Sequence, residues 1–228
     1  MDINTLQQLQ QKMAQQVIVL ADDSPSILQN DSIIFTLDIQ YVEDAGYVAL
    51  DVMRMNGEHL GIYGSREAVP SAYVPGLFCF REGPPLKTLI EKVEAQIPYK
   101  ADLIIVDGHG LAHPRLFGVA CWLGVELDRP TIGCAKRTLV KYDTTLDTQR
   151  GSTTPILVED KLVGYALRTQ DSVKPLYVSV GHKVSLKETT DVILQLAQPY
   201  RVTEPVRRAD QAARALAKGE APSNVIHL

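Results

Sequence analysis

The chain has 228 residues, of which 45% are hydrophobic and 22% are charged, as in an ordinary globular domain. Its formal net charge of −4 excludes a protein that attracts polyanions through overall basic charge, although a local basic face would suffice for nucleic acid. The N-terminus lacks a basic segment followed by an apolar one, and no apolar run is long enough to span a bilayer. We therefore expect a cytoplasmic protein with no membrane partner.

The first third of the chain predicts a helix followed by a three-stranded meander. Apolar residues recur at helical spacing over residues 3–20, and the many glutamines there are expected to form the solvated face. Residues 32–41 predict a strand. Two further strands, over residues 47–55 and 59–65, are joined through Asn56-Gly57, a dipeptide typical of hairpin turns.

The remainder of the chain alternates between strands and helices. A connection rich in proline and glycine over residues 68–85 precedes a predicted amphipathic helix over residues 86–97. The strands expected after it cover residues 103–106, 130–136, 155–159, 162–168 and 176–180. The helices expected there cover residues 115–123, 185–197 and 205–218, the last capped from Thr203 with Glu204 in its first turn. This order predicts a single α/β domain over residues 1–228, built on a mixed sheet.

Three cysteines, Cys79, Cys121 and Cys134, are far apart in the sequence and have apolar neighbours. Their odd number and spacing fit neither a disulfide framework nor a zinc site. We expect them to be buried free thiols in a reducing compartment.

The segment from Asp107 to Arg115 reads Asp-Gly-His-Gly-Leu-Ala-His-Pro-Arg and directly follows a predicted buried strand. A strand would hold the Asp107 carboxylate on a rigid backbone, and glycines allow a ligand to approach the main chain closely. Histidines can donate, accept or transfer protons. The alternative is a polar connection in which Asp107 caps the next helix.

Four acids stand where the fold could gather them: Asp38, Glu82, Asp107 and Asp210. A convergent carboxylate cluster is too repulsive to remain unpaired, and hard divalent cations such as Mg²⁺ relieve that repulsion. Two such ions can activate a water and stabilise the leaving oxygen of a phosphodiester attack. The alternative for each acid is a solvated surface charge or a helix cap. That alternative is weaker for Asp38 and Asp107, which interrupt or end apolar strands.

Two further residues have a functional and an ordinary interpretation. Tyr73 precedes Val74-Pro75-Gly76, so its ring could enter a base stack and hold a gap open, or it could pack a loop onto the surface. Lys136 could contact the scissile phosphate, or it could be the solvated end of a strand. A local basic face could be formed by cations that are otherwise scattered surface charges, namely Arg115, Lys136, Arg137, Lys141, Lys183, Arg207 and Arg208.

Six segments in collinear order resemble the endonuclease V, or deoxyinosine 3′ endonuclease, family. They are Tyr73-Val74-Pro75-Gly76, Phe80-Arg81-Glu82, residues 107–115, Ile132-Gly133-Cys134-Ala135-Lys136, residues 181–185 and residues 204–210. The resemblance implies an RNase H-like fold and a Mg²⁺-dependent enzyme of DNA repair, with Mn²⁺ as a substitute. Such an enzyme recognises hypoxanthine in nucleic acid and cleaves the second phosphodiester bond on its 3′ side.

The resemblance also implies roles for individual residues. Asp38 and Asp107 are similar to the principal metal ligands, and Glu82 and Asp210 to the supporting acids of the same site. Lys136 is similar to the residue that meets phosphate or the attacking water. The wedge and the base pocket would be formed by Tyr73, Val74, Pro75, Gly76, Gly108, Gly110 and His113. His182 has no assigned role. The implied partner is inosine-containing DNA, and a monomer is expected.

The chain departs from the family pattern at two places. Ala72 stands where the family usually has proline, and Phe35-Thr36-Leu37 precedes Asp38 without the usual Ala-Gly. All four acids are present, so an active enzyme is predicted. Two alternatives remain at this point: an endonuclease that acts mainly on inosine in RNA, and a non-catalytic binder of damaged DNA.

Overall fold

The predicted meander forms the first half of a mixed sheet. In this computed structural model, which describes residues 2–70 and 74–228, β2 (Ile33–Val42), β3 (Ala45–Arg54) and β4 (His59–Ala68) pair antiparallel. The turn between β3 and β4 contains Gly57 at a φ of +98°, a left-handed conformation that glycine adopts without strain.

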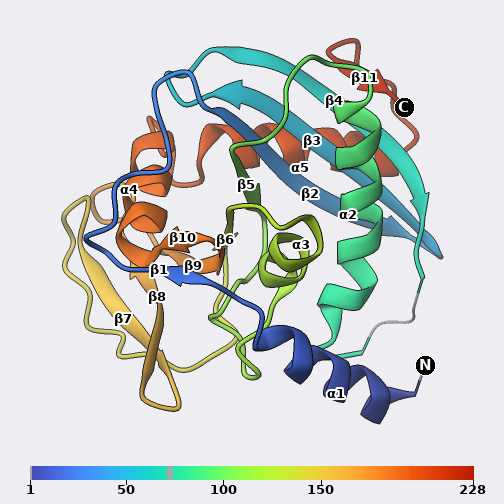
Figure 1. Cartoon of the computed structure of the whole chain (residues 1–228). Helices are drawn as coiled ribbons and strands as arrows, with labels where there is room; N and C mark the ends of the chain where they lie inside the picture. The colour runs from blue at the N-terminus through green and yellow to red at the C-terminus, as the bar shows by residue number, and fades with distance from the viewer. Residues whose placement is uncertain (1, 71–73) are drawn as a thin grey trace.

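Within the described residues, nine strands join in one sheet in the order β11-β4-β3-β2-β5-β6-β9-β8-β7 (Figure 1). The later strands are β5 (Leu103–Val106), β6 (Thr131–Ala135), β7 (Thr153–Val158), β8 (Lys161–Leu167), β9 (Leu176–His182) and β11 (Val225–His227). β5 runs parallel to both β2 and β6, whereas β9 and β8 return antiparallel. The carboxyl ends of β2, β5 and β6 therefore meet at one edge, where ligands commonly bind in open α/β sheets.

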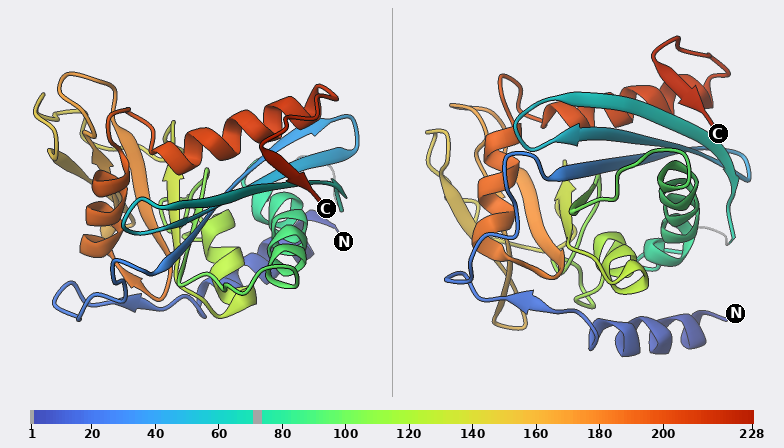
Figure 2. Two further views of the ribbon diagram at one scale, coloured as in Figure 1. Left: turned by 90° about the horizontal axis from the view of Figure 1, so that it is seen from above. Right: turned by 45° about the horizontal axis from the view of Figure 1, so that its top comes forward.

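Helices cover both faces of the sheet, as Figure 2 shows. On one face, α2 (Phe78–Glu94) and α3 (Val119–Leu127) pack on a core that includes Phe35 and Leu37 of β2. α1 (Ile3–Ala14) lies outside them and buries Met13 in the same core. On the other face lie α4 (Leu186–Leu196) and α5 (Glu204–Ala217). Alternate residues of β2 therefore face different layers, and Asp38 lies on the face covered by α5.

Three predicted boundaries were wrong. The first helix ends at Ala14, and residues 19–20 instead form β1 (Val19–Leu20), which pairs with β10 (Val184–Ser185). α2 begins at Phe78 instead of residue 86, so Glu82 lies inside the helix. α3 begins at Val119 instead of residue 115.

The early start of α2 places Pro84 and Pro85 inside a helix, which the sequence pattern disfavours because proline removes a helical hydrogen bond. Tertiary packing outweighs this loss, since Leu86, Leu89 and Ile90 are fully buried. Gly83 contributes to that packing, because a Cβ at this position would lie 2.1 Å from the Trp122 ring on α3.

Two further expectations concern single side chains. Thr203 stands at the N-cap of α5, as predicted, but its side chain makes no capping hydrogen bond and its hydroxyl is buried without a partner. The three cysteines are buried and free, as expected.

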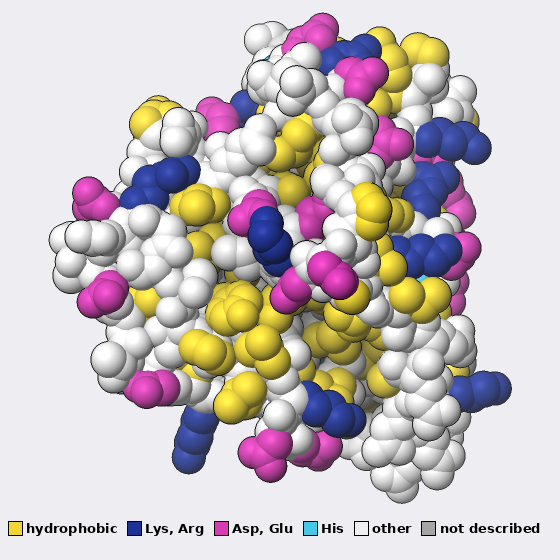
Figure 3. All heavy atoms as spheres, turned by 60° about the vertical axis from the view of Figure 1, so that its left-hand side comes forward, with side chains coloured by type: hydrophobic (Ala, Val, Ile, Leu, Met, Phe, Trp, Pro, Cys, Tyr) yellow, Lys and Arg dark blue, Asp and Glu magenta, His cyan; other side chains and the backbone are white. Residues whose placement is uncertain are grey.

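Among the described residues, no helix has the length and apolar composition needed to cross a membrane. The face shown in Figure 3 carries intermixed acidic and basic side chains, with no single-sign patch.

Candidate active site

Asp38 and Asp107 lie side by side because they occupy equivalent positions on neighbouring parallel strands. Leu37 of β2 pairs with Val106 of β5, and the N–H of Asp107 donates to the carbonyl of Leu37 at 3.0 Å. Asp38 is the next residue of β2 after that pair, and Asp107 is the first residue after the end of β5. Asp38 is 7% exposed, and its Oδ1 accepts the Ile39 N–H at 2.8 Å. Backbone pairing therefore sets the spacing of the two carboxylates.

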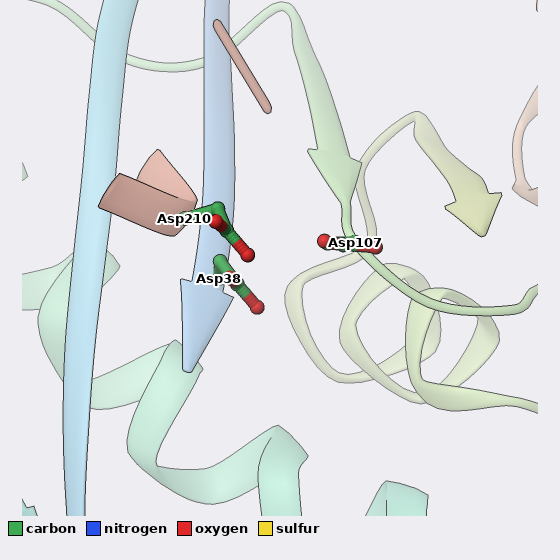
Figure 4. A group of neighbouring side chains, drawn as sticks. All are labelled: Asp38, Asp107 and Asp210. Atoms are coloured by element: carbon green, nitrogen blue, oxygen red, sulfur yellow. The ribbon is translucent and has the colours of Figure 1, made fainter. Parts of the chain in front are cut away.

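Asp210 reaches the same place from α5. This helix crosses β2 and β3, and it is attached to β3 by Arg208, whose guanidinium donates to both carboxylate oxygens of Asp51 at 2.6 and 2.9 Å. Asp210 lies two residues further along the helix and points toward the ends of the strands. Figure 4 shows Asp38 and Asp210 directed toward Asp107 across the gap between β2 and β5.

These three aspartates form a group that fits a divalent cation. One carboxylate oxygen from each of Asp38, Asp107 and Asp210 lies within 4.8 Å of the other two. Carboxylate oxygens are the donors that hard cations such as Mg²⁺ and Mn²⁺ select. Glu82 does not belong to this three-membered group. It lies on α2 and faces Asp107 closely enough for the two charges to repel.

Two cations partly neutralise the group. Lys136 directly follows β6, and its Nζ lies 2.5 Å from Oδ2 of Asp107 and 3.0 Å from Oδ1 of Asp210. Arg214, one turn after Asp210 on α5, donates to both oxygens of that carboxylate at 2.8 and 3.1 Å. Three acids and two bases leave one formal negative charge, so an added divalent cation would be attracted.

Burial and mutual repulsion perturb the pKa values of these acids. Desolvation, followed by the charge of Asp107, raises the pKa of Asp38 well above its ordinary value. Desolvation also raises the pKa of Asp107, although Lys136 opposes it. Burial acts to raise the pKa of Asp210, but hydrogen bonds from Arg214 and Lys136 outweigh it and the pKa is lowered. Perturbed carboxylates in a cleft are typical of functional sites.

Glu82 lies on α2, apart from the group formed by the three aspartates. Burial, reinforced by the charge of Asp107, raises its pKa to about 7, while the neighbouring Tyr41 hydroxyl acts in the opposite direction. A carboxyl group with a pKa of about 7 is only partly ionised at neutral pH, and a cation placed beside it favours the ionised form. Glu82 can therefore contribute a negative charge to the site, although it is not a member of the group of three aspartates.

A cavity of about 430 Å³ opens beside the acids. Its lining includes Glu82, Asp107 and Lys136, together with Gly108, His109 and His113 of the glycine- and histidine-rich segment. A larger cavity of about 540 Å³, between residues 22–31 and α4, contains none of the three grouped aspartates. Of these two cavities, the one of about 430 Å³ is therefore the one that adjoins the grouped aspartates.

The structure excludes the helix-cap interpretation of Asp107, because α3 begins at Val119, twelve residues after Asp107, and its N-cap is Gly118. The two glycines of the segment have different surroundings. Gly108 lines the cavity. Gly110 packs against β9, where a Cβ would lie 2.0 Å from the Val180 carbonyl oxygen, so tight backbone packing requires a glycine there.

The two histidines of the segment are held in place by backbone groups. His109 Nε2 lies 2.9 Å from the carbonyl oxygen of Arg137. His113 Nδ1 accepts the N–H of Arg115 at 3.1 Å, and its ring also hydrogen-bonds the Gly76 backbone. Burial, followed by the charge of Arg115, lowers the pKa of His113 to about 4. The ring is therefore neutral at pH 7, with the proton on Nε2.

The remaining predicted residues are placed as follows. Tyr73 and Ala72 lie outside the described residues, and the described part of that segment contains Val74, Pro75 and Gly76. His182 lies opposite Thr131, at the other end of β6 from Lys136. Its Nδ1 accepts the Ile18 N–H at 3.1 Å, so it attaches the N-terminal segment to the sheet.

Sequence reasoning missed two residues near the acids. Arg214 could have been found, because it lies four residues after Asp210 on a predicted helix. Leu139 lines the cavity, but no sequence pattern distinguishes it from other residues of a loop. Arg137, which the sequence suggested for a local basic face, lines the same cavity.

Comparison with known proteins agrees with this geometry. The sequence model of the endonuclease V family matches residues 11–211. The chain belongs to the endonuclease V family. An endonuclease V of Dictyoglomus thermophilum is 41% identical over 174 residues, which cover 76% of this chain and 75% of that protein. Members of this family are nucleases that act on phosphodiester bonds, and the chain is accordingly an endonuclease.

Solved endonuclease V structures share the fold. The Streptomyces avermitilis enzyme superposes with a TM-score of 0.86 at 34% identity, covering 96% of this chain and 94% of that one. A Ciona intestinalis endonuclease V, solved in complex with a 24mer DNA containing an inosine followed by a ribo-adenosine, has a TM-score of 0.82 at 20% identity. It covers 95% of this chain and 98% of its own. The α/β fold expected from the sequence, with its RNase H-like mixed sheet, is thus that of endonuclease V.

Proposed function

We propose that the chain is a Mg²⁺-dependent endonuclease that recognises deoxyinosine in DNA and cleaves the second phosphodiester bond 3′ to it. The observation that carries this proposal is the convergence of Asp38, Asp107 and Asp210 beside the cavity lined by Gly108 and His113. Membership of the endonuclease V family supports the reaction class. The inosine-containing DNA bound by the Ciona relative supports the substrate.

The three aspartates would hold the metal, with Mn²⁺ as a substitute for Mg²⁺, and Glu82 would support them from α2. A bound divalent cation supplies Lewis-acid polarisation of phosphate and a water of lowered pKa. The side chains around it have separate tasks. Lys136 carries a positive charge between Asp107 and Asp210, where it can also meet a phosphate oxygen. Arg214 keeps Asp210 ionised and oriented.

Base recognition would take place in the neighbouring cavity. Duplex nucleotides must be flipped out before an enzyme pocket can enclose the base. The cavity wall offers backbone groups around Gly108 and a neutral His113 ring. Val74, Pro75 and Gly76, with Tyr73 before them, would form the wedge segment that fills the vacated stack. Gly110 would support the pocket from behind through its packing on β9.

We also propose that residues 1–228 form one domain that acts as a monomer in the cytoplasm. Pairing of β11 near the end of the chain with β4 in the same sheet supports a single domain. Three buried free cysteines are typical of a reducing compartment.

The test uses purified full-length protein and labelled oligonucleotides that differ only in one inosine. With Mg²⁺, we expect a single nick one nucleotide beyond the inosine, and none in the guanosine control. Asp38→Asn and Asp107→Asn should both abolish it. Matched RNA strands run beside the DNA strands decide whether RNA is the preferred substrate. Inosine-dependent binding without cutting under any divalent ion would identify a non-catalytic binder and refute the proposal.

A further inference from the structure

Gln10 is a fully buried amide on a helix whose other glutamines are exposed or partly exposed. The sequence predicts that the glutamines of α1 form its exposed face, and Gln8 and Gln11 do so, while Gln7 is partly exposed. Gln10 is 0% exposed, which contradicts that prediction for this one residue. Burying an amide is unfavourable unless its hydrogen bonds are satisfied. The partners of Gln10 therefore indicate what it does.

The Gln10 amide joins two distant segments of the chain. Its Nε2 donates to the carbonyl of Gly76 at 3.0 Å and to the carbonyl of Phe117 at 2.8 Å. Its Oε1 accepts from Nε of Arg115 at 2.5 Å. Both N–H groups and the carbonyl oxygen are thus used, with Cys79 Sγ a weaker contact at 3.6 Å. Neither an apolar nor a charged side chain of similar size could make this set of contacts.

The two segments are those that line the cavity beside the acids. Gly76 is followed, after one residue, by Phe78 and Cys79, and Phe117 is followed by Gly118 and Val119. All four of these following residues line the cavity. Gln10 does not line it. The amide therefore lies behind the cavity wall and connects its two sides.

The Gly76 carbonyl accepts hydrogen bonds from two side chains. It accepts from Gln10 and also from Nη2 of Arg115 at 2.5 Å, and the His113 ring hydrogen-bonds the Gly76 backbone. Gly76 has a φ of +78°, and a Cβ there would lie 2.4 Å from Arg115 Nη2. A left-handed glycine has access to many conformations, so the chain at this position needs external hydrogen bonds to keep one of them.

We propose that Gln10 is a positioning residue for base recognition. By connecting the Gly76 and Phe117 carbonyls and orienting Arg115, it preorganises the cavity for a flipped base before substrate arrives. Gln10 lies outside residues 11–211, the part of the chain that the family model matches. The inference rests on the proposed function, because it assigns this cavity to the base.

If Gln10 preorganises the cavity wall, its loss should weaken substrate binding, because a wall that must become ordered on binding lowers the affinity. Gln10→Leu removes the side-chain donor to the buried Phe117 carbonyl and the acceptor for Arg115 Nε, and it leaves the Gly76 carbonyl with Arg115 Nη2 as its remaining side-chain donor. We expect the half-saturating concentration of an inosine oligonucleotide to rise about tenfold, the typical effect of one unsatisfied buried group. The single-turnover rate at saturating substrate should stay within about threefold, since Gln10 touches none of the acids.

The experiment compares Gln10→Leu with Gln11→Leu, which places the same substitution on the exposed side of the same helix. Cleavage of inosine and guanosine oligonucleotides gives the half-saturating concentration, the rate and the discrimination ratio. Hydrogen exchange of peptides covering residues 74–80 and 116–120 is measured without substrate. Gln10→Leu should raise exchange in both peptides and lower discrimination, and Gln11→Leu should change neither. Gln10→Glu, which keeps the acceptor for Arg115 but loses the donors to both carbonyls, should reproduce the defect if Gln10→Leu does not fold.

Three results would overturn the inference: equal exchange in the Gln10 and Gln11 variants, a loss of rate without a change in half-saturation, or an unchanged discrimination ratio. These differ from failure of the proposed function, in which the wild-type protein would itself show no inosine-dependent cleavage. The exchange measurement needs no activity, so it tests the connection between the two segments in either case.

Discussion

His113 should make the folded protein less stable as the pH falls below about 6.5. Its ring is 3% exposed, and burial, followed by the charge of Arg115, lowers its pKa from 6.5 to about 4. Between these values the unfolded chain binds a proton that the folded protein does not. Stability therefore rises with pH in this window and is lost as the pH falls through it.

The size of the effect follows from the shift. At pH 5, linkage gives a loss of about 2 kcal/mol relative to pH 8, and the full shift corresponds to about 3 kcal/mol below pH 4. His113→Asn does not titrate in this range and keeps an acceptor for the Arg115 N–H. The gap in stability between wild type and His113→Asn should therefore shrink by about 2 kcal/mol between pH 8 and pH 5.

The free energy of unfolding of wild type and His113→Asn is measured by urea unfolding in EDTA at pH 8, 6.5 and 5. Because all other titrating groups are common to the two proteins, the difference between their free energies reports on His113. His227→Asn provides a matched control, since His227 is exposed on β11. The gap between wild type and this control should stay constant. Parallel loss of stability in wild type and His113→Asn would refute the reasoning.

Three further predictions concern the charges around the acids. Asp38→Asn should raise the stability of the metal-free protein, because a desolvated and repelled carboxylate is removed, and should abolish the increase in melting temperature on adding Mg²⁺. Lys136→Met removes the cation between Asp107 and Asp210, so calorimetric titration should show divalent binding that is tighter by roughly tenfold, while cleavage falls. Arg208→Met leaves Asp51, which is 0% exposed, without its guanidinium partner. Urea unfolding should then show a loss of about 3–5 kcal/mol, partly restored by Asp51→Leu in the same chain.

Local sequence patterns predicted the elements that form the centre of the sheet. Alternating and continuous apolar runs identified β2, β5 and β6, because these strands bury side chains on both faces. The pattern failed at α2, where local propensity disfavours Pro84 and Pro85 and burial of the following residues decides the outcome. It also failed after residue 14, because β1 forms only by pairing with β10, more than 160 residues away. A local pattern contains no information about such a partner.

The candidate site shows the same division. The sequence alone placed an acid on β2 and another after β5, and parallel pairing of those strands makes the two carboxylates neighbours. The sequence also named Glu82 and Asp210 as candidate acids, and resemblance to the family gave both the same supporting role. Only the tertiary structure separated them: attachment of α5 through Arg208 brings Asp210 into the group, whereas Glu82 remains on α2 at its side.

Gln10 marks the limit of what the sequence determined by itself. Its neighbours in the sequence are those expected around an exposed glutamine on an amphipathic helix. Its function depends on carbonyls 66 and 107 residues further along the chain. Periodicity reports which face of an element is apolar, because burial of apolar surface is non-directional and recurs at every turn. A buried hydrogen-bond network is directional and depends on where distant segments meet, so only the folded structure decides it.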